Sequence, residues 1–592
     1  MLPKRKRHGA DDASRSTTAK RTRHTSSPDL LSLLSDELLV RILSYLPLSD
    51  LLNIAPVSDR FYHISGDSQI WKRLYYSRFV LPRALRIPGF RDGSAREGKL
   101  HYSSRKAIWA DGRRGGWIDM RSGVEDKDSR NWKRQYKLRH NWSKGKCAVE
   151  ELRVGRESDL PSNTESSHRM LVKVSEGLAV TADIVTGLQA WDLKTKQLLA
   201  QVSLDKNGPT AAPSCITIDN QNLQESNLHI AIGFTDGSFG VWRLDITEKE
   251  LIQQYRHEKS SNGELLEIAF SYPYLLTATK SVLISLYTFE RRSVSKSSLL
   301  NIPSEDENET ETEHDSDEEG EENQIDNGVE PKIKSDSKRQ AHHTTLPAPY
   351  LLTSLKSHTS RAPLALSLRK LAISTIASIA YTFNTMQGWS LGIQDLHIRP
   401  ATSKSKLTPE ITTTRLAYTL PIKTPSRTRG TSPPRHTTSS GPPLADDLDG
   451  PINICYTHPY LLATLPDNTL ILYLCKSNAS SLSISPGIRL WGHTSGISDA
   501  EITARGKAVS VSCRGEEIRV WELEGRADGR SIEVRPTAKS SLATNTKERG
   551  SEAATLARWD ERRNWVGFDD EMVIVLKESG EGDESLLVYD FT

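Results

Sequence analysis

Apolar residues between positions 30 and 74 follow the three- to four-residue period of a helix face. One stripe is formed by Leu34, Leu38, Leu39, Ile42, Leu43 and Leu46. Ser35 stands where it can cap this helix, and Asp36 and Glu37 place negative charge near the exposed N–H groups of its first turn. Pro47 ends it, because proline has no N–H to donate. The pattern therefore predicts a helix that begins after Ser35.

Further apolar residues predict two more short helices and a closing apolar pair. The second helix starts at Leu48, the third runs from about Pro56 to Ile64, and Trp71 and Leu74 follow. Three short helices bury little surface by themselves, and the first two contain more leucine than their inner faces need. The segment is either an ordinary helical subdomain docked within the chain or a surface for a partner.

From about residue 150 the pattern changes to short apolar strands. One type of strand recurs along the chain, and each copy has a large residue near its end, aromatic in every copy but one, which has a glutamine. We call these residues the blade markers: Trp191, Trp242, Tyr287, Gln394, Tyr473, Trp521 and Tyr589. The first two intervals are 51 and 45 residues (191 to 242 and 242 to 287), close to the ~40–45 residues of a WD-repeat blade. His493, after a glycine, is the outer signature residue of the blade that contains Trp521. The markers predict an all-β propeller of about seven WD-like blades.

A propeller has no free edge when a strand from the other end of the chain closes its last blade. Residues 147–155 read CAVEELRVG and stand just before the first blade, whereas LLVYDF stands at the end of the chain. We expect these two segments to pair.

The helical segment resembles an F-box. The resemblance rests on LSDELL, ILSYLPLSDLL, VSDRFY and IWKRL, with serine at position 35 where that family usually has proline. It implies that these helices bind the Skp-type adaptor of a cullin-RING ubiquitin ligase. Contacts to the adaptor, or supports for them, are expected at Leu34, Leu38, Leu39, Ile42, Leu46, Pro47, Leu48, Leu51, Leu52, Val57 and Trp71.

Residues 131–145 place aromatic rings among basic side chains, which permits two interpretations. Aromatic residues interleaved with arginine can stack on RNA bases. The run also resembles the W-x-x-x-Y-x-x-R-x-N-W-x-x-G linker that precedes the propeller in F-box/WD-repeat proteins. That resemblance places Trp132, Tyr136 and Trp142 where the linker packs on the propeller. We favour this second interpretation, and nucleic acid is then not an expected partner.

These features predict a multidomain chain, with a small all-α domain and a helical linker before the propeller. The expected parts are a disordered basic tail at 1–27, an F-box domain at 28–78, a helical linker at 79–145 and a propeller at 146–592. Disordered insertions are expected at about 301–345 and 397–450. The first contains 12 Asp or Glu within residues 305–322, and the second is rich in Ser, Thr and Pro.

The basic tail contains two clusters separated by residues 8–19. The clusters comprise Lys4, Arg5, Lys6 and Arg7, then Lys20, Arg21 and Arg23. This spacing resembles a bipartite nuclear import signal, which would bind an import carrier; the alternative is a solvated arm with loose affinity for nucleic acid. We expect the protein in the nucleus, the cytoplasm or both.

Composition and motifs argue against an enzyme, a membrane protein and a metalloprotein. Only 36% of the 592 residues are hydrophobic, and the mean hydropathy is −0.51. No run in the sequence approaches the ~18 apolar residues of a membrane span. The 5 cysteines are scattered without a metal-ligand spacing, and we find no catalytic motif. We therefore expect no catalytic residue, metal or cofactor.

The resemblance implies the substrate-recognition subunit of an SCF-type E3 ubiquitin ligase, in which the F-box binds the adaptor and the propeller recruits a protein substrate. Two alternatives remain open at this point. One alternative is a non-catalytic WD-repeat interaction scaffold. The other is a nuclear RNA-associated propeller protein with no role in ubiquitination.

Overall fold

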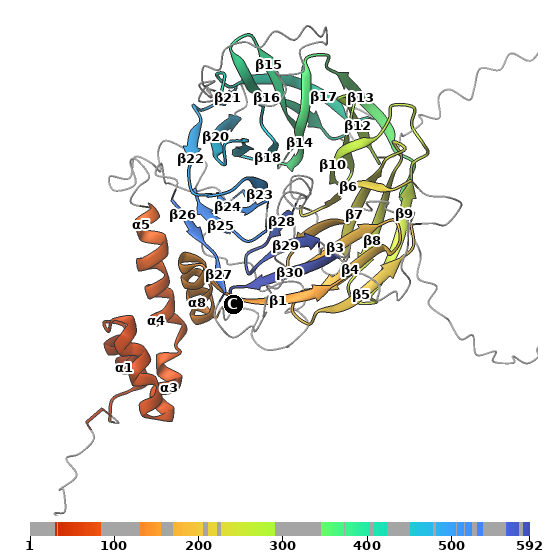
Figure 1. Ribbon diagram of the computed structural model, residues 1–592. Helices are drawn as coiled ribbons and strands as arrows, with labels where there is room; N and C mark the ends of the chain where they lie inside the picture. Colours follow the sequence, from red (N-terminus) through yellow and green to blue (C-terminus); the bar gives the residue numbers. More distant parts are fainter. Residues whose placement is uncertain are drawn as a thin grey trace, which may run out of the picture. The chain divides into compact units, whose positions relative to one another are not determined.

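The computed structural model describes 16 stretches of the chain. They are residues 30–31, 33–84, 131–154, 170–204, 211–221, 227–290, 345–371, 373–401, 408–422, 450–477, 481–504, 506–513, 515–523, 530–536, 564–578 and 584–592. These residues belong to two compact units (Figure 1). The helical unit comprises Met1–Leu81 and Ser129–Tyr136, and the propeller unit comprises Pro82–Asp128 and Lys137–Thr592. The predicted basic tail, residues 85–130 of the predicted linker and residues 301–344 of the predicted insertion at about 301–345 lie outside the described residues.

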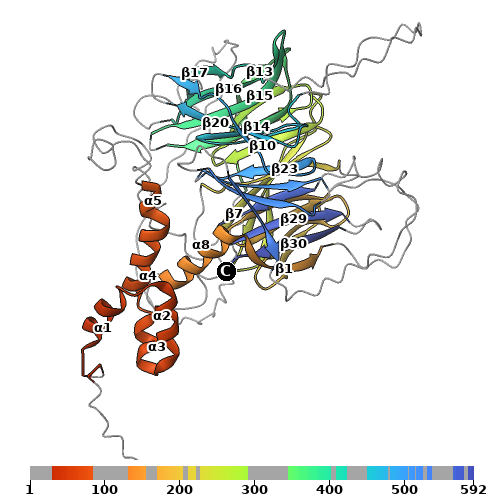
Figure 2. The same cartoon turned by 60° about the vertical axis from the view of Figure 1, so that its left-hand side comes forward.

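Short helices make up the helical unit (Figure 2). In order they are α1 (Asp36–Leu43), α2 (Leu48–Ile54), the 3-10 turn η1 (Ala55–Val57), α3 (Asp59–Ser65), α4 (Ser68–Tyr75), the π-helical turn η2 (Tyr76–Val80), α5 (Leu81–Ala84) and α8 (Trp132–Lys144). Helices α5 and α8 each run across the boundary between the two units. The fold therefore confirms a small all-α domain before the propeller.

The helix ends differ from the expected ones in two details. Ser35 is at the N-cap position of α1, but its side chain makes no capping hydrogen bond to the backbone. Helix α1 also ends at Leu43, so Leu46 lies in the turn before Pro47. The expected type of cap occurs at later helices, where Ser58 accepts from the Phe61 N–H at 3.2 Å.

Seven antiparallel sheets form the propeller and lie in a ring (Figure 1). Blade 1 contains β2 (Leu171–Ser175), β3 (Leu178–Asp183), β4 (Gly187–Asp192) and β5 (Gln197–Val202). Blade 2 contains β6 (Pro213–Ile218), β7 (Asn227–Phe234), β8 (Phe239–Asp245) and β9 (Glu250–Arg256). Blade 3 contains β10 (Leu265–Ser271), β11 (Tyr274–Thr279), β12 (Leu283–Thr288) and β13 (Tyr350–Lys356).

The remaining blades follow in chain order. Blade 4 contains β14 (Ser360–Lys370), β15 (Thr375–Thr385), β16 (Gly388–Arg399) and β17 (Glu410–Tyr418). Blade 5 contains β18 (Asn453–Thr457), β19 (Tyr460–Thr464), β20 (Leu470–Ser477), β21 (Leu482–Ile484) and β22 (Ile488–Leu490). Blade 6 contains β23 (Ile497–Ile502), β24 (Lys507–Ser512), β25 (Ile518–Glu522) and β26 (Ser531–Glu533). Blade 7 contains β28 (Trp565–Phe568), β29 (Met572–Glu578), β30 (Glu584–Asp590) and β1 (Lys146–Arg153), with β27 (Arg535–Pro536) beside β1.

All seven markers occupy the same place in their blades. They lie on β4, β8, β12, β16, β20, β25 and β30, the third strand of each sheet. The regular spacing arises because each blade repeats the same order of strands, so that the same position on the third strand recurs once per blade. The predicted number of about seven blades is confirmed.

The closing strand of the last blade also lies where the sequence places it. Strand β1 pairs antiparallel with β30, from Ala148 opposite Asp590 to Arg153 opposite Ser585. Its other edge pairs in parallel with β27 at Lys146 and Cys147. The first strand of the propeller thus completes the blade that contains the last one.

The predicted insertion at 397–450 begins too early. Strand β17 lies inside this range and pairs with β16 from Arg399 opposite Glu410 to Gly392 opposite Tyr418. Its run of three threonines fits an outer strand because threonine is β-branched and all three side chains are exposed. Ser- and Thr-rich composition therefore did not distinguish an outer strand from a disordered segment.

His493 joins the loop before blade 6 to the middle of that blade. Its Nε2 lies 2.6 Å from Ser510 Oγ, and the same hydroxyl accepts a hydrogen bond from Trp521 Nε1 at 2.8 Å. Burial lowers the pKa of His493 to about 4, although the Glu517 carboxylate lies 3.5 Å from Nδ1. The imidazole is therefore neutral at neutral pH and acts as a hydrogen-bonding group.

We expect Ser510→Ala to destabilise the propeller by about 1–3 kcal/mol, because it removes a buried hydroxyl that bonds two side chains. The midpoint of thermal unfolding, followed by circular dichroism, should fall by several degrees. Ser483→Ala removes an exposed hydroxyl from β21 and should leave the midpoint unchanged. Equal midpoints for the two variants would show that the His493–Ser510–Trp521 contacts add nothing to stability.

Candidate functional site

The helical unit has a compact core formed by one face of each helix. Its buried members are Leu39, Leu43, Leu51, Ile64, Ile70, Trp71, Tyr75, Trp132 and Tyr136. The Trp71 indole donates to the carbonyl of Ser65 at 2.7 Å, so the largest buried side chain of α4 has its polar atom satisfied. These contacts fix the directions of the remaining faces of α1 and α2.

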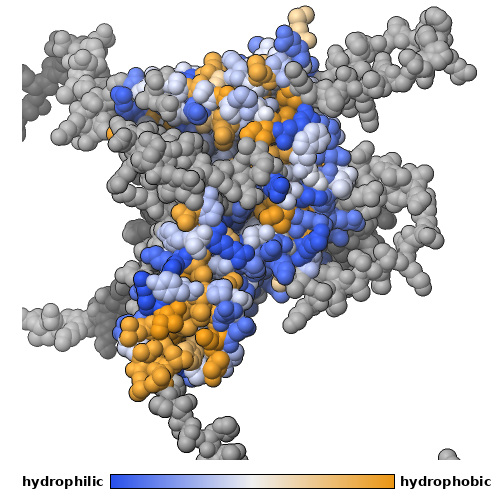
Figure 3. Space-filling model, turned by 90° about the vertical axis from the view of Figure 1, so that its left-hand side faces the viewer, coloured by the Kyte–Doolittle hydropathy of each residue, from blue (hydrophilic) through white to orange (hydrophobic). Residues whose placement is uncertain are grey.

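A second set of apolar side chains, from α1 to α3 and from the residues just before and between these helices, faces solvent. The exposed members include Leu30, Leu31, Leu33, Leu38, Ile42, Tyr45, Leu52, Val57 and Tyr62. Figure 3 shows apolar side chains gathered on this part of the chain. We call this set the exposed apolar surface. Its extent exceeds the scattered apolar residues of an ordinary protein surface, and a contiguous patch of this kind is typical of a protein-binding site.

The structure separates the predicted adaptor-binding residues by their exposure. Leu38, Ile42, Leu52 and Val57 belong to the exposed apolar surface, and Pro47 is exposed beside it in sequence. Leu34, Leu46 and Leu48 are half-buried. Leu39, Leu51 and Trp71 are buried in the core, with 1%, 1% and 4% of their surface exposed. Any role of these last three is to support the surface from below.

Tyr45 is a further exposed residue that the sequence interpretation did not include. Two arginines lie close to its ring, with the guanidinium carbon of Arg41 5.3 Å and that of Arg73 4.9 Å from the ring centre. Cations over an aromatic face hold the ring in place. The available signal was its position in the turn between the end of α1 and Pro47, where no inward side chain is needed.

Arg60 connects α3 with the start of α1. Its Nη2 donates to the carbonyl of Leu34 at 2.5 Å and to Asp36 Oδ1 at 2.6 Å. The pKa of the Glu37 carboxyl is lowered because its own backbone N–H and the Ser35 hydroxyl donate to it. The first turn of α1 is therefore held by charged groups, which leaves its apolar side chains free for a partner.

The first half of α8 belongs to the helical unit. Tyr136 packs edge-on against Trp71 at 5.4 Å between ring centres, and its hydroxyl accepts from Arg78 at 2.6 Å. Trp132 packs against Tyr75 at 5.5 Å. The prediction assigned Trp132 and Tyr136 to packing on the propeller, and the structure corrects this assignment to the helical core. The residues are one helical turn apart, so they share a face, but sequence spacing does not say which unit that face meets.

The second half of α8 belongs to the propeller unit. The Trp142 ring stacks on Phe591 at 3.9 Å, and its indole donates to the carbonyl of Asp570 at 2.9 Å. Lys507 places its ammonium 3.7 Å from the centre of the Trp142 ring. Trp142 thus packs on the propeller, as the sequence predicts. All three aromatic rings of α8 are buried, which leaves none of them available to stack on RNA bases.

Metal sites and membrane-spanning helices were both sought among the described residues. Over these stretches, no group of three or more His, Cys, Asp or Glu side chains is arranged to hold a metal ion. Within the same stretches, no helix combines the length and apolar character that crossing a membrane requires.

Comparison with known proteins identifies both units. The family model described as F-box protein pof12 beta-propeller matches residues 147–592, and the model described as F-box-like matches residues 36–77. The mouse (Mus musculus) protein F-box only protein 15 is 31% identical over 135 residues. This match covers 23% of the chain and 26% of the mouse protein, so the chain spans about a quarter of that relative.

Solved structures resemble the chain only distantly. The U3-55K structure shows 9% identity and a TM-score of 0.36 over 75% of this chain and 98% of that one. The RRP9 WD40 repeats show 9% identity and a TM-score of 0.37 over 75% and 97%. The designed Ika8 protein shows 10% identity and a TM-score of 0.32 over 71% and 83%. Likeness at this level says nothing about what the chain binds.

Each of the two family matches falls within one of the two folded units. The F-box-like match covers α1 to α4, whose outer faces form much of the exposed apolar surface. The propeller match begins at the closing strand β1 and extends to the last residue. The chain belongs to the family of F-box proteins with the pof12-type β-propeller.

Proposed function

We propose that this chain is the substrate-recognition subunit of an SCF-type ubiquitin ligase. F-box domains bind Skp-type adaptors, and F-box propeller proteins act as non-catalytic adaptors. In this role the helical unit binds the adaptor, the adaptor connects to a cullin-RING ligase, and the propeller recruits a protein substrate. The observation that carries the proposal is the exposed apolar surface within the F-box-like segment.

Keeping the exposed apolar surface in contact with water is unfavourable in free energy. Leu38, Ile42 and Leu52 are each about half exposed, although the same helices bury Leu39 and Leu51 almost completely. Each large apolar side chain that a partner covers contributes about 1.5–3 kcal/mol to association. Three such residues on adjoining short helices therefore provide the central apolar contacts of a stable protein interface.

In such a ligase the chain contributes proximity rather than bond chemistry. A substrate held on the propeller meets the charged transfer enzyme at a raised effective concentration, which accelerates ubiquitin transfer. The chain itself then needs no nucleophile, acid or base.

Binding of the purified Skp-type adaptor to the full chain tests the proposal. We expect a complex of one chain with one adaptor in size-exclusion chromatography with light scattering. Failure of the folded chain to bind the adaptor at micromolar concentrations would contradict the proposed function. An adaptor complex that admits no cullin would support the scaffold alternative instead.

We also propose that the basic tail directs the protein to the nucleus. The supporting feature is the pair of basic clusters at Lys4–Arg7 and Lys20–Arg23. Alanine at all seven basic positions should lower the nuclear-to-cytoplasmic ratio of a fluorescent fusion several-fold, because the acidic grooves of an import carrier bind these charges. An unchanged ratio would exclude the tail as an import signal.

A further inference from the structure

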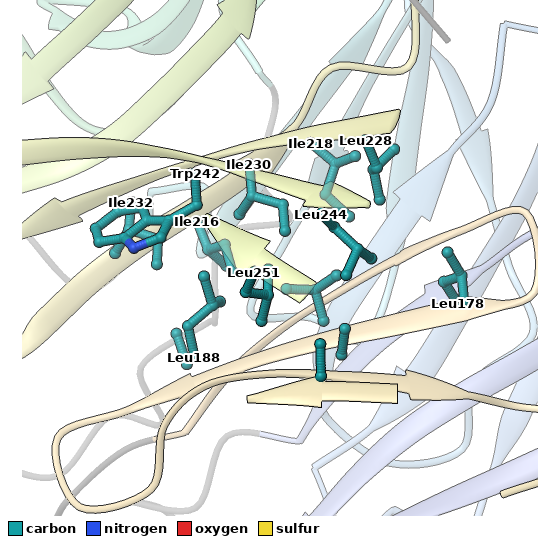
Figure 4. Packing of buried hydrophobic residues seen from close by; sticks show 14 of the residues in the cluster. Leu178, Leu188, Ile216, Ile218, Leu228, Ile230, Ile232, Trp242, Leu244 and Leu251 are labelled. Atoms are coloured by element: carbon teal, nitrogen blue, oxygen red, sulfur yellow. The ribbon is translucent and has the colours of Figure 1, made fainter. Parts of the chain in front are cut away.

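The marker side chain of each blade lies at the junction with the preceding blade. Trp242 of blade 2 belongs to an apolar cluster that also contains Leu178 and Leu188 of blade 1 (Figure 4). Trp521 of blade 6 packs in a cluster with Leu462 and Leu472 of blade 5. The other four aromatic markers belong to clusters that likewise draw on the preceding blade. A tryptophan or tyrosine ring is therefore the side chain that normally fills this junction.

Blade 4 is the exception, because its marker is Gln394. A cavity of about 170 Å³ lies at the junction of blades 3 and 4 and is partly open to solvent. It is lined by Val282, Ile284, Leu355, Lys356, Ser357, Ser360, Leu364, Ile379, Tyr381 and Gln394. This volume is comparable with that of an engineered protein cavity of about 150 Å³ that binds benzene, so it suits a single ring. The space is found at the junction where the aromatic marker is missing.

The apolar side chains that line this cavity are firmly held. Val282, Ile284, Leu364 and Ile379 are buried members of the core cluster shared by blades 3 and 4. The Tyr381 ring covers Gly392, where an added Cβ would lie 2.5 Å from Tyr381 Cζ. Because these walls belong to a densely packed core, they keep the cavity's shape fixed for an incoming side chain.

The mouth of the cavity is polar and basic. Four of its residues keep part of their surface exposed. Lys356 is exposed, and Ser357, Tyr381 and Gln394 are half-buried. No acidic side chain occurs among the lining residues or from Lys356 to Arg361, on the connection between β13 and β14. A ligand that carries negative charge next to an apolar group therefore complements this site.

We propose that this cavity, the blade 3–4 pocket, binds an aromatic side chain from an acidic segment of another protein. The six aromatic markers show which side chain suits a blade junction, and Lys356 favours carboxylates beside it. An aromatic side chain buries about 150–250 Å² and so anchors a peptide segment efficiently. The site stands on the propeller's own geometry; identifying its partner as the recruited substrate rests on the proposed function.

The acidic segment of this chain does not match the required ligand. It precedes β13, but residues 291–344 contain no phenylalanine, tyrosine or tryptophan. It can offer carboxylates to Lys356 without an aromatic ring to fill the pocket. The occupant is accordingly a separate protein.

The probe is the acetylated and amidated pentapeptide Asp-Glu-Trp-Glu-Asp, titrated against the full chain without adaptor and followed by saturation-transfer NMR. We expect the indole protons to receive the strongest saturation, with binding in the millimolar range or tighter. The same peptide with alanine in place of tryptophan should bind at least about tenfold more weakly, because the ring supplies the apolar contact.

Three variants locate the binding. Gln394→Tyr restores an aromatic marker and fills the pocket, so it should weaken the tryptophan peptide at least about tenfold. Gln394→Met keeps nearly the same side-chain volume as glutamine, so it should leave binding close to that of the wild type. Gln387→Tyr is the matched control, since it makes the same change at an exposed position of the β15–β16 turn outside the lining. It should bind like the wild type.

A fourth variant tests the charge of the mouth. Lys356→Glu should weaken the acidic peptide several-fold and remove most of the salt dependence of binding. The unfolding midpoints of all variants should match the wild type or, for the filled pocket, exceed it.

Equal binding of the tryptophan and alanine peptides, wild-type affinity in a folded Gln394→Tyr variant, or no binding of the tryptophan peptide at millimolar concentration would each overturn the proposal. These results do not involve the adaptor. They therefore leave the F-box part of the proposed function to its own experiment.

Discussion

Deletion of residues 584–592 is expected to abolish folding of the propeller. The deletion removes β30, the third strand of blade 7, and leaves both β1 and β29 without their common neighbour. It also removes Phe591, on which Trp142 of α8 stacks. The ring then opens at the blade that joins its two ends, and two strand edges become free to aggregate.

The size of this effect follows from what the strand buries. Leu586, Val588 and Phe591 have 0%, 3% and 0% of their surface exposed, and each buried side chain of this size contributes ~1.5–3 kcal/mol. The sum, together with the lost strand pairing, is comparable with the whole stability of a typical folded domain, about 5–15 kcal/mol. We expect the truncated protein to be insoluble, or soluble without a cooperative unfolding transition.

Two further variants grade this prediction. Phe591→Ala keeps the strand and should lower stability by about 3–5 kcal/mol, which thermal unfolding followed by circular dichroism detects. Deletion of Thr592 alone is the control, because it removes only the last residue beyond β30. A truncated protein that lacks 584–592 but melts like the wild type would show that β1 does not close the ring through β30.

The double variant Leu38→Asp, Leu52→Asp is expected to lose adaptor binding by at least about a hundredfold. Both side chains are about half exposed, so aspartate at these positions is solvated in the free protein and the helical core remains intact. In the complex each carboxylate would be buried without a partner, which is strongly unfavourable. Isothermal titration of the adaptor into the full chain measures the loss.

The matched control places the same two charges elsewhere on the domain. Ser68→Asp, Gln69→Asp adds two carboxylates at exposed positions in the first turn of α4, where negative charge is favourable. This variant should bind the adaptor like the wild type. Undiminished binding by a folded Leu38→Asp, Leu52→Asp variant would show that the exposed apolar surface is not the adaptor site. Leu51 is unsuitable for such a test, because it is buried and aspartate there would unfold the domain.

The propeller could be predicted in outline because its repeat imposes a local rule. The third strand of each blade alternates apolar and polar positions and has a large side chain at the same place. Trp191, Trp242 and Trp521 therefore align without any knowledge of the fold. The pairing of β1 with β30 followed from the need to remove a free edge. Strand β17 escaped prediction because its threonines suit a disordered segment as well as an outer strand.

The candidate sites were less predictable because they depend on which side of a helix or strand meets a neighbour. The stripe of α1 contains Leu38 and Leu39 as adjacent residues, and only packing shows that one is exposed and the other buried. Trp132 and Trp142 lie on one helix yet belong to different units. Gln394 is visible in the sequence as an irregular marker, but the cavity beside it depends on whether neighbouring side chains fill the space.

The most direct test of the ligase assignment asks whether this chain brings a cullin to the adaptor. Purified full chain, Skp-type adaptor and cullin-RING complex are mixed, and the cullin that copurifies with the tagged chain is quantified. We expect cullin to copurify in stoichiometric amount, and only when the adaptor is present. The Ser68→Asp, Gln69→Asp variant should retain it, and the Leu38→Asp, Leu52→Asp variant should lose it. Absence of cullin from the wild-type chain while the adaptor is fully bound would contradict the ligase assignment.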